Sequence, residues 1–333
     1  MTPLTVLVVG TGGIARRHIA TLRSLVPALR MVVLRASTRA LETPLEPDIH
    51  VVSSMDEALA MVPTCAVIAG PATTHIATAL PIVAARIPTL IEKPLSDRLD
   101  GVEALIETAR VSATPVMVGY ILRFHPGLQR VRQVVREGGV GRPMGLRAEV
   151  GQYLPDWRPT VPVHETVSAQ MALGGGALLE LSHEIDYARW IVGEAVEVRA
   201  DLRRLGDVTV DVEDWVDVHW STADGVAVGL HMDMLQRAPV RWCRVIGSEA
   251  TVEADLIRGE VWRRGPQGVV ESLHPEGGVD RQAAGRAEMQ ALLAMVAGEP
   301  SPIPLEEGRR TLTVVEAARA SAAEGGTGVR ACA

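Results

Sequence analysis

Hydrophobic and polar residues follow two alternating patterns along the first 120 residues. Short apolar runs rich in Val, Ile and Leu are typical of buried strands, and between them apolar residues recur every three or four positions, as on one face of a helix. We expect strands at residues 4–9, 31–36, 65–69, 89–91 and 116–119, and helices at 14–25, 55–61, 74–85 and 97–110. Strands that alternate with helices form a parallel sheet, whose ligands bind beyond the carboxyl ends of the strands.

After residue 126 and a helix expected at 127–137, apolar and polar residues alternate singly, as in strands with one covered and one open face. These runs lie at residues 145–154, 195–204, 215–221, 226–235, 241–246, 251–256 and 260–263. They predict a large, mostly antiparallel sheet whose open face would take a ligand or a second subunit. Two further helices, at 282–297 and 306–323, are expected to close the chain.

Composition limits the class of protein. A chain of 333 residues is long enough for two domains, and 47% hydrophobic with 22% charged residues is typical of a globular protein. The net charge of −7 and the scattered arginines argue against a nucleic-acid partner. Apolar runs are too short to cross a membrane, and the start lacks the basic region of a signal peptide, so we expect a cytoplasmic protein. Three widely spaced cysteines predict neither a disulfide framework nor a metal site.

A glycine-rich turn follows the first predicted strand. Gly10-x-Gly12-x-x-Ala15 is the spacing of a dinucleotide phosphate turn, in which Gly10 permits the tight bend and Gly12 leaves room for a pyrophosphate. Gly13 and Ile14 begin the helix whose free N–H groups would face the phosphates. We therefore predict a Rossmann NAD(P)-binding domain over residues 1–122 and a substrate-binding and oligomerisation domain over 123–333.

The end of the second strand indicates which cofactor is bound. An NAD site usually carries an acidic residue there for the ribose 2′-hydroxyl, but this chain has Ser37, Thr38 and Arg39. Small hydroxyls beside an arginine suit a 2′-phosphate, so NADP(H) is favoured. If Arg39 is only a solvated loop residue, NAD(H) is possible.

The next strand end carries Gly70-Pro71 and, five residues after Gly70, His75. A proline turn before a capped helix explains this stretch structurally. Its position also places Gly70, Pro71 and His75 beside the cofactor, without a catalytic role for the histidine.

The following strand ends in Glu92-Lys93-Pro94, where the nicotinamide of a bound cofactor is expected. Pro94 favours an extended backbone at Lys93. A lysine is more often a solvated surface residue, so this motif alone leaves both interpretations open.

Aromatic residues gather between residues 120 and 190. The one Phe, all three Tyr and two of the six Trp lie there. This concentration predicts either a binding pocket or packing at the domain junction. We expect Tyr120, Tyr153 and Trp157 to contact substrate, with Arg123 and Arg158 available for an acidic group.

A second dense stretch runs from Gly174 to Trp190. If it forms one helix, Glu180 and His183 share a face with Asp186 or Tyr187, and the carboxylate would orient the imidazole and raise its basicity. A polar stripe on a helix surface, or a buried histidine held in the core, explains the same residues.

Together these stretches resemble the Gfo/Idh/MocA family, the relatives of glucose–fructose oxidoreductase and inositol dehydrogenase. The resemblance spans the chain: the Gly10 turn, Ala69-Gly70-Pro71 with His75, Glu92-Lys93-Pro94, Arg123-Phe124-x-Pro126, and the Gly174–Trp190 stretch. It implies hydride transfer between a nicotinamide and a sugar, polyol or nucleotide-sugar hydroxyl, in a homodimer or homotetramer formed through the C-terminal sheet.

The resemblance also implies site residues. Lys93 and His183 would be the acid/base pair with Glu180 beside them, and Glu92 and Arg123 would also contact the cofactor. The family's second motif usually reads Asp-x-x-x-His, whereas this chain has Glu180-x-x-His183. A non-catalytic nucleotide-sensing module of the same fold, or a dihydrodiol- or biliverdin-type reductase, are the alternatives. The substrate, the carbon oxidised and the direction of the reaction are left open by the sequence.

Overall fold

The computed structural model describes residues 4–35, 44–274, 280 and 282–331. They form two compact units. The first holds the residues up to 120 together with 285–309, and the second holds 121–284 together with 310–333. The sequence-based boundary at residue 122 does not anticipate the return of 285–309 to the first unit.

The first unit is built on a six-stranded parallel sheet in the order β3-β2-β1-β4-β5-β6. Its strands are β1 (Thr5–Val9), β2 (Arg30–Leu34), β3 (His50–Val52), β4 (Cys65–Ile68), β5 (Thr89–Glu92) and β6 (Val116–Gly119). Val8 pairs with Val33 on one side and Val67 on the other, and all three side chains are fully buried. This is the predicted Rossmann sheet.

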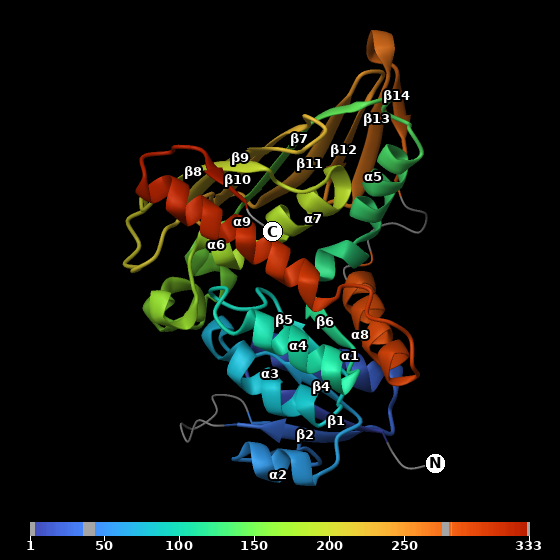
Figure 1. The fold of residues 1–333 in the computed structure, drawn as a ribbon, viewed down its shortest axis with the longest axis vertical. Helices are drawn as coiled ribbons and strands as arrows, with labels where there is room; N and C mark the ends of the chain where they lie inside the picture. Colours follow the sequence, from blue (N-terminus) through green and yellow to red (C-terminus); the bar gives the residue numbers. More distant parts are fainter. Residues whose placement is uncertain (1–3, 36–43, 275–279, 281, 332–333) are drawn as a thin grey trace. The chain divides into compact units, whose positions relative to one another are not determined.

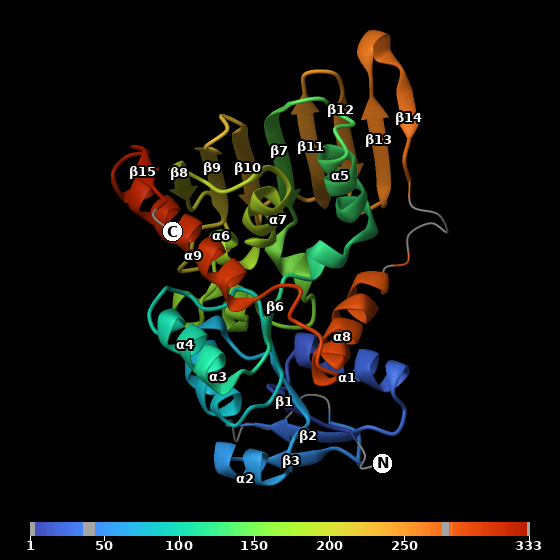
Figure 2. The ribbon, with the colours of Figure 1, turned by 45° about the vertical axis from the view of Figure 1, so that its right-hand side comes forward.

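Five helices accompany this sheet: α1 (Gly13–Leu25), α2 (Met55–Ala60), α3 (His75–Ala84), α4 (Val102–Ser112) and α8 (Ala283–Val296). α1 lies against β1 and β4, whereas α3 lies against β4 and β5. The segment after α8 joins the sheet through the N–H of Val118, which donates to the Ile303 carbonyl at 2.9 Å. α8 and α1 lie side by side (Figures 1 and 2).

Two predictions in this unit need correction. β3 was not predicted, because three residues at a sheet edge, two of them exposed, leave no apolar run to detect. α4 begins at Val102 and not at Asp97, since Gly101 has a left-handed backbone (φ +77°) that precedes the helix.

The second unit is built on a nine-stranded sheet in the order β14-β13-β12-β11-β7-β10-β9-β8-β15. The strands are β7 (Pro143–Gly151), β8 (Glu197–Arg203), β9 (Trp215–Ser221), β10 (Ala227–Asp233), β11 (Val240–Gly247), β12 (Thr251–Asp255), β13 (Glu260–Arg264), β14 (Val270–Ser272) and β15 (Val329–Arg330). All neighbours are antiparallel except β7 and β10, which run parallel. The large, mostly antiparallel sheet is confirmed, and only its two short edge strands, β14 and β15, were missed.

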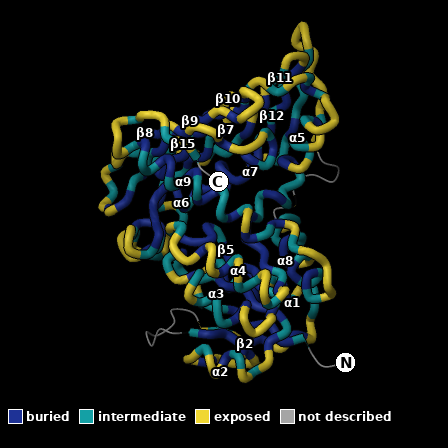
Figure 3. Tube along the Cα trace, viewed as in Figure 1, coloured by how far each residue is buried: buried dark blue, intermediate teal, exposed yellow. Residues whose placement is uncertain are grey.

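One face of this sheet is covered by helices. α5 (Pro126–Arg136) packs on β12 and β13, while α6 (Ala177–Glu180) and α7 (His183–Val192) pack on the central strands (Figure 2). The last helix, α9 (Leu305–Ala323), reaches the sheet through the Ser321 hydroxyl, which accepts a hydrogen bond from the Ala200 N–H at 3.0 Å. Along β9, buried residues alternate with less buried ones, so this strand has one covered and one more exposed side (Figure 3).

Candidate functional site

The turn between β1 and α1 has the geometry expected of a phosphate turn. Gly10 has φ +110°, and a Cβ at this position would lie 2.8 Å from the Ala69 carbonyl oxygen, so the position requires glycine. At Gly12, which caps α1, no described atom lies within 4 Å of where a Cβ would be. The first turn of α1, with Gly13 and Ile14, contains no acidic residue. Its N–H groups and the positive end of the helix dipole are therefore suited to an anion.

The residues predicted to select the cofactor, Ser37, Thr38 and Arg39, lie outside the described part of the chain. β2 ends just before them, and the N–H of Arg35 donates to the Val52 carbonyl of β3 at 3.0 Å. Their role stays a prediction.

His75 connects two loops at the carboxyl ends of the strands. Its ring is buried, with Nδ1 2.9 Å from the Pro94 carbonyl oxygen and Nε2 3.0 Å from the Gly70 carbonyl oxygen. Burial lowers the pKa of His75 against the effect of these hydrogen bonds. A neutral imidazole donates only one N–H, so one of the two contacts is satisfied at a time. His75 thus holds the Gly70–Pro71 turn beside the Glu92–Pro94 turn.

Glu92, the last residue of β5, turns its carboxylate inward. Oε1 lies 2.6 Å from His18 Nε2 on α1, and Oε2 accepts a hydrogen bond from the Lys93 N–H at 3.0 Å. Burial opposes ionisation of Glu92, but the hydrogen bond and charge of His18, with the charges of Lys93 and Arg17, outweigh it and keep the pKa below its usual value. Glu92 therefore shapes the turn that carries Lys93.

Lys93 is the only lysine in the chain, although lysines and arginines together number 33. Arginine serves at every other position that needs a long basic side chain. An arginine is always charged, whereas a lysine can release its proton when its surroundings favour that, so the residue at position 93 differs in its chemistry from the other basic side chains. This signal was present in the sequence and was missed.

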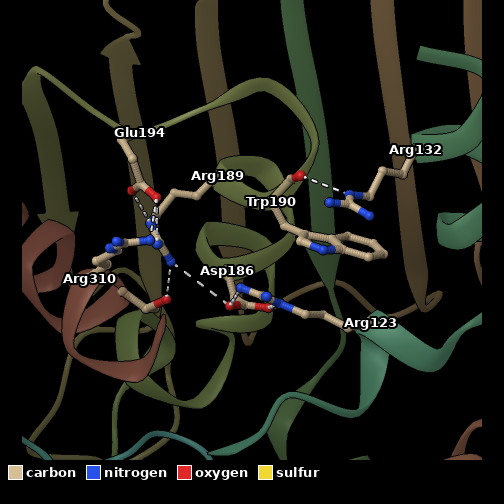
Figure 4. Close-up of polar contacts among 8 residues, drawn as sticks. Arg123, Arg132, Asp186, Arg189, Trp190, Glu194 and Arg310 are labelled. Carbon is tan, nitrogen blue, oxygen red and sulfur yellow. Dashed lines mark hydrogen bonds and ion pairs between the residues drawn. The ribbon is translucent and has the colours of Figure 1, made fainter. Parts of the chain in front are cut away.

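In the second unit, Arg123 is paired inside the protein. Its Nε and a terminal nitrogen donate to the two Asp186 carboxylate oxygens at 2.9 and 2.7 Å (Figure 4), with both side chains buried. Asp186 therefore occupies the bidentate face of this guanidinium, and the predicted contact of Arg123 with cofactor and substrate stays a prediction. Sequence spacing could not reveal a partner 63 residues away.

The same network anchors α7. Arg189 donates to both Glu194 carboxylate oxygens at 2.7 and 2.9 Å, and also to the Thr311 hydroxyl at 2.7 Å on α9 (Figure 4). On the other side of α7, the Arg132 guanidinium stacks 4.2 Å from the Trp190 ring centre and donates to its carbonyl. These contacts fix the helix that His183 begins.

Glu180 and His183 do not share one helix. α6 ends at Glu180 and α7 begins at His183. Between them, the N–H groups of Ser182 and Glu184 donate three residues back, to Leu179 and Leu181, so the i→i−4 hydrogen bonds of one helix are interrupted. The single helix expected through Glu180 and His183 is therefore two helices joined by a tighter turn, and the role of Glu180 beside His183 stays a prediction. His183 is 8% exposed.

Glycines at 174–176 serve the start of α6. Gly176 has φ +103°, and a Cβ there would overlap the Glu213 carboxylate. Glu213 accepts the N–H of Ala177 at its carbonyl (2.9 Å) and the N–H of Leu178 at Oε1 (3.0 Å). Burial raises the pKa of Glu213, against the hydrogen bonds that its carboxylate accepts from its own N–H and from that of Leu178. Glu213 thus caps α6 from a distant loop, which no local motif could show.

The predicted substrate contacts differ in their surroundings. Tyr120 has no exposed surface, which favours a packing role. The Tyr153 ring lies 3.5 Å from the Arg237 guanidinium carbon, and the Trp157 indole N–H donates to the Gln152 carbonyl at 3.1 Å. Arg158 is exposed just after this short helical turn.

Comparisons with known proteins agree with this architecture. Residues 4–120 match the model described as "Oxidoreductase family, NAD-binding Rossmann fold", and residues 128–253 match the "GFO/IDH/MocA C-terminal domain". Myo-inositol dehydrogenase Hyg17 of Streptomyces leeuwenhoekii is 30% identical over 310 residues, covering 90% of each chain.

Two solved structures are similar over nearly the whole chain. Levoglucosan dehydrogenase in complex with NADH and levoglucosan has a TM-score of 0.86 at 19% identity, covering 100% of both chains. GenD2 from gentamicin A biosynthesis, in complex with NAD, has a TM-score of 0.83 at 26% identity, covering 100% of this chain and 97% of that one.

Fold and matches define the class: a dehydrogenase that acts on CH–OH groups with an NAD(P) dinucleotide. Within that class, the chain belongs to the Gfo/Idh/MocA family, among sugar and polyol dehydrogenases. Among the described residues, no helix is both long and apolar enough to cross a membrane.

Proposed function

We propose that this protein oxidises one hydroxyl of a sugar or polyol, with Lys93 and His183 as its acid/base pair. The carbinol carbon gives a hydride to C4 of the oxidised nicotinamide, the hydroxyl oxygen gives its proton to the protein, and a carbonyl forms. In the opposite direction the same groups return the proton to the carbonyl oxygen.

The observation that carries this proposal is the position of the only lysine. Lys93 follows β5 at the edge of the sheet where ligands of such folds bind, in a turn held by Glu92 and His75. Its ammonium would hydrogen-bond the reacting oxygen and exchange a proton with it as the hydride moves.

His183 is proposed to exchange the proton with the substrate oxygen or with Lys93. It begins α7, which the Arg189 network and the Glu184–Arg241 pair (2.8 Å for both hydrogen bonds) hold in place. A base fixed in this way keeps its orientation during transfer. Glu180, the last residue of α6, remains a proposed contributor beside His183.

The proposed substrate is a small cyclic polyol or sugar, free or nucleotide-linked. Dehydrogenases of myo-inositol and levoglucosan among the similar proteins support this class. Tyr153, Trp157 and Arg158 are proposed to contact it, as rings that stack on a sugar face and a cation that binds an acidic group.

For the cofactor, Ser37, Thr38 and Arg39 support NADP(H), whereas two similar structures hold NADH and NAD. Titration of the purified protein with NADPH and with NADH, which measures the affinity for each, distinguishes the two cofactors. Tighter binding of NADPH that is lost in Arg39→Ala supports a 2′-phosphate site, and tighter binding of NADH in the unchanged protein contradicts it.

A homodimer or homotetramer is proposed to form through the more exposed face of the nine-stranded sheet. Trp242 and Arg244 of β11 pair in register with Glu149 and Arg147 of β7 on this face, and the Trp242 indole N–H donates to Glu149 at 3.1 Å. Trp242 is half-buried and both arginines are exposed, and aromatic residues and arginine are enriched at protein interfaces. Light scattering coupled to size-exclusion chromatography tests this proposal by measuring the molar mass. The unmodified protein is expected to have the mass of a dimer or tetramer and Trp242→Glu that of a monomer. A monomeric unmodified protein contradicts the proposal.

The reaction is tested by following reduction of NAD⁺ and NADP⁺ with a panel of inositols, anhydrosugars, aldoses, uronic acids and nucleotide sugars. Turnover with at least one cyclic polyol or sugar is expected. Binding of nicotinamide cofactor without reduction by any of these compounds, in either direction, contradicts the proposal.

A further inference from the structure

Three polar side chains meet in the interior of the first unit. His18 of α1, Glu92 of β5 and Glu288 of α8 are all buried, and one ligand-type atom from each lies within 4.8 Å of the others. His18 and Glu92 are joined at 2.6 Å. Neither carboxylate oxygen of Glu288 has a hydrogen-bond partner among the described residues.

A buried, unpartnered carboxylate beside a second carboxylate is unfavourable unless a positive charge or a proton compensates it. The charged groups that act on Glu288 are Glu92 from β5 and Arg17 from α1, and His18 from α1 completes the cluster. Burial, and then the charge of Glu92, raise the pKa of Glu288 well above its usual value, against the smaller effect of Arg17.

A divalent cation fits the His18–Glu92–Glu288 cluster less well than a proton on Glu288 does. Donors on one zinc ion at bond lengths of about 2.0–2.1 Å stand roughly 3.3 Å apart in a tetrahedron. His18 Nε2 and Glu92 Oε1 are closer than that, at a separation that a shared proton produces. His18 and Glu92 are therefore already hydrogen-bonded to each other. The buried Glu288 carboxyl has no such partner among the described residues, so its charge is compensated by a proton.

We propose that Glu288 is a positioning residue for Lys93: as a neutral acid it donates a hydrogen bond toward the Glu92 carboxylate, directly or through one water molecule, and with His18 fixes the Glu92–Pro94 turn. Glu92 in turn accepts the Lys93 N–H at 3.0 Å. Gly119, opposite Glu92 on β6, leaves the space for this carboxylate, since a Cβ there would lie 3.2 Å from Oε2. The inference rests on the proposed role of Lys93 in catalysis.

The single lysine makes a direct test available. Protein of these 333 residues labelled with [¹³Cε, ¹⁵Nζ]lysine gives one side-chain signal, from Lys93. Glu288→Gln keeps the size and the donor of a neutral acid, so the Lys93 signal is expected to match that of the unmodified protein. Glu288→Leu fills the volume without a donor, and is expected to shift or broaden the signal. Met289→Leu, a buried swap on the same helix, is the control and should leave it unchanged.

A second measurement needs neither turnover nor the Leu variant. A carboxylic acid that stays protonated in the folded state, but ionises when unfolded, adds stability at low pH that is lost as pH rises. From about pH 5 upward, the unfolding constant of the unmodified protein should therefore rise relative to that of Glu288→Gln, by up to about tenfold per pH unit.

The outcomes are separable from those of the proposed function, which is tested by turnover. A constant stability difference between the unmodified protein and Glu288→Gln from pH 5 to 8 overturns the inference. An unchanged Lys93 signal in folded Glu288→Leu, or a stoichiometric divalent metal in the purified protein that Glu288→Gln lacks, overturns it too.

Discussion

The Arg123 guanidinium and the Asp186 carboxylate form a parallel, two-bond ion pair at 2.9 and 2.7 Å, with side-chain exposures of 7% and 1%. The pair joins the short 3-10 helix Ile121–Phe124, at the start of the second unit, to α7. Its bidentate geometry explains why arginine stands here, since a lysine would offer a single point charge.

Removing one partner of this pair should destabilise the protein strongly. Arg123→Ala leaves the Asp186 carboxylate buried, with the Arg189 guanidinium 3.9 Å away as incomplete compensation. We expect a loss of about 3 kcal/mol in the free energy of unfolding, measured in urea. The matched control is Arg110→Ala, which breaks an exposed ion pair with Glu107 and should shift the midpoint little. Equal effects of the two variants would contradict this account of Arg123.

The two glycines of the phosphate turn should respond differently to alanine. Gly10→Ala adds a Cβ at φ +110° and 2.8 Å from the Ala69 carbonyl oxygen, so it should lower the thermal midpoint by several degrees. Gly12→Ala meets no described atom within 4 Å and should leave the midpoint nearly unchanged. It should nevertheless weaken NADH binding at least about tenfold, because the methyl enters the space predicted for the pyrophosphate. If Gly12→Ala binds NADH as tightly as the unmodified protein does, the prediction that this turn binds the pyrophosphate is contradicted.

A third prediction concerns the more exposed face of the large sheet. His231 lies between Asp217 (2.9 Å) and Asp233 (3.1 Å). The hydrogen bond to Asp233 is the largest cause and, with Asp217, outweighs burial and raises the pKa of His231 to about 9. A raised pKa stabilises the fold fully below the unfolded value near 6.5, and this contribution disappears as pH rises through 9.

His231→Gln should therefore cost on the order of 1 kcal/mol at pH 6, a figure reduced for solvent screening, and almost nothing at pH 9.5. Urea unfolding at the two pH values measures it. A penalty that is the same at both would show that the histidine acts by packing, for instance through its edge-to-face contact with Trp215 at 4.3 Å.

Local patterns predicted the elements that position the site. The ends of β1, β4 and β5 and the start of α1 follow from apolar runs, glycine and proline, which act within a few residues. The same patterns located Gly10, Gly12 and Lys93, since a parallel sheet brings its carboxyl strand ends to one edge.

What the sequence could not show depends on partners far apart in the chain. His18 and Glu288 stand out only as polar residues on otherwise apolar helix faces, and nothing local connects either of them to Glu92. Likewise, the helix is interrupted after Glu180 because the N–H groups of Ser182 and Glu184 donate to carbonyls three residues earlier. A prediction based on 3.6 residues per turn assumes donation to the carbonyl four residues earlier. The Arg123–Asp186 pair could not be predicted either, because its partners are 63 residues apart and meet only in the folded chain.

The central claim, that Lys93 moves a proton at the substrate oxygen, is tested most directly by Lys93→Arg. This change keeps the positive charge and makes the chain free of lysine, but the guanidinium cannot release a proton. Single-turnover hydride transfer should fall by at least about 100-fold, as far as in Lys93→Ala, while NADH binding by nicotinamide fluorescence stays within a few-fold of the unmodified protein. Hydride transfer in Lys93→Arg at the rate of the unmodified protein would contradict the account.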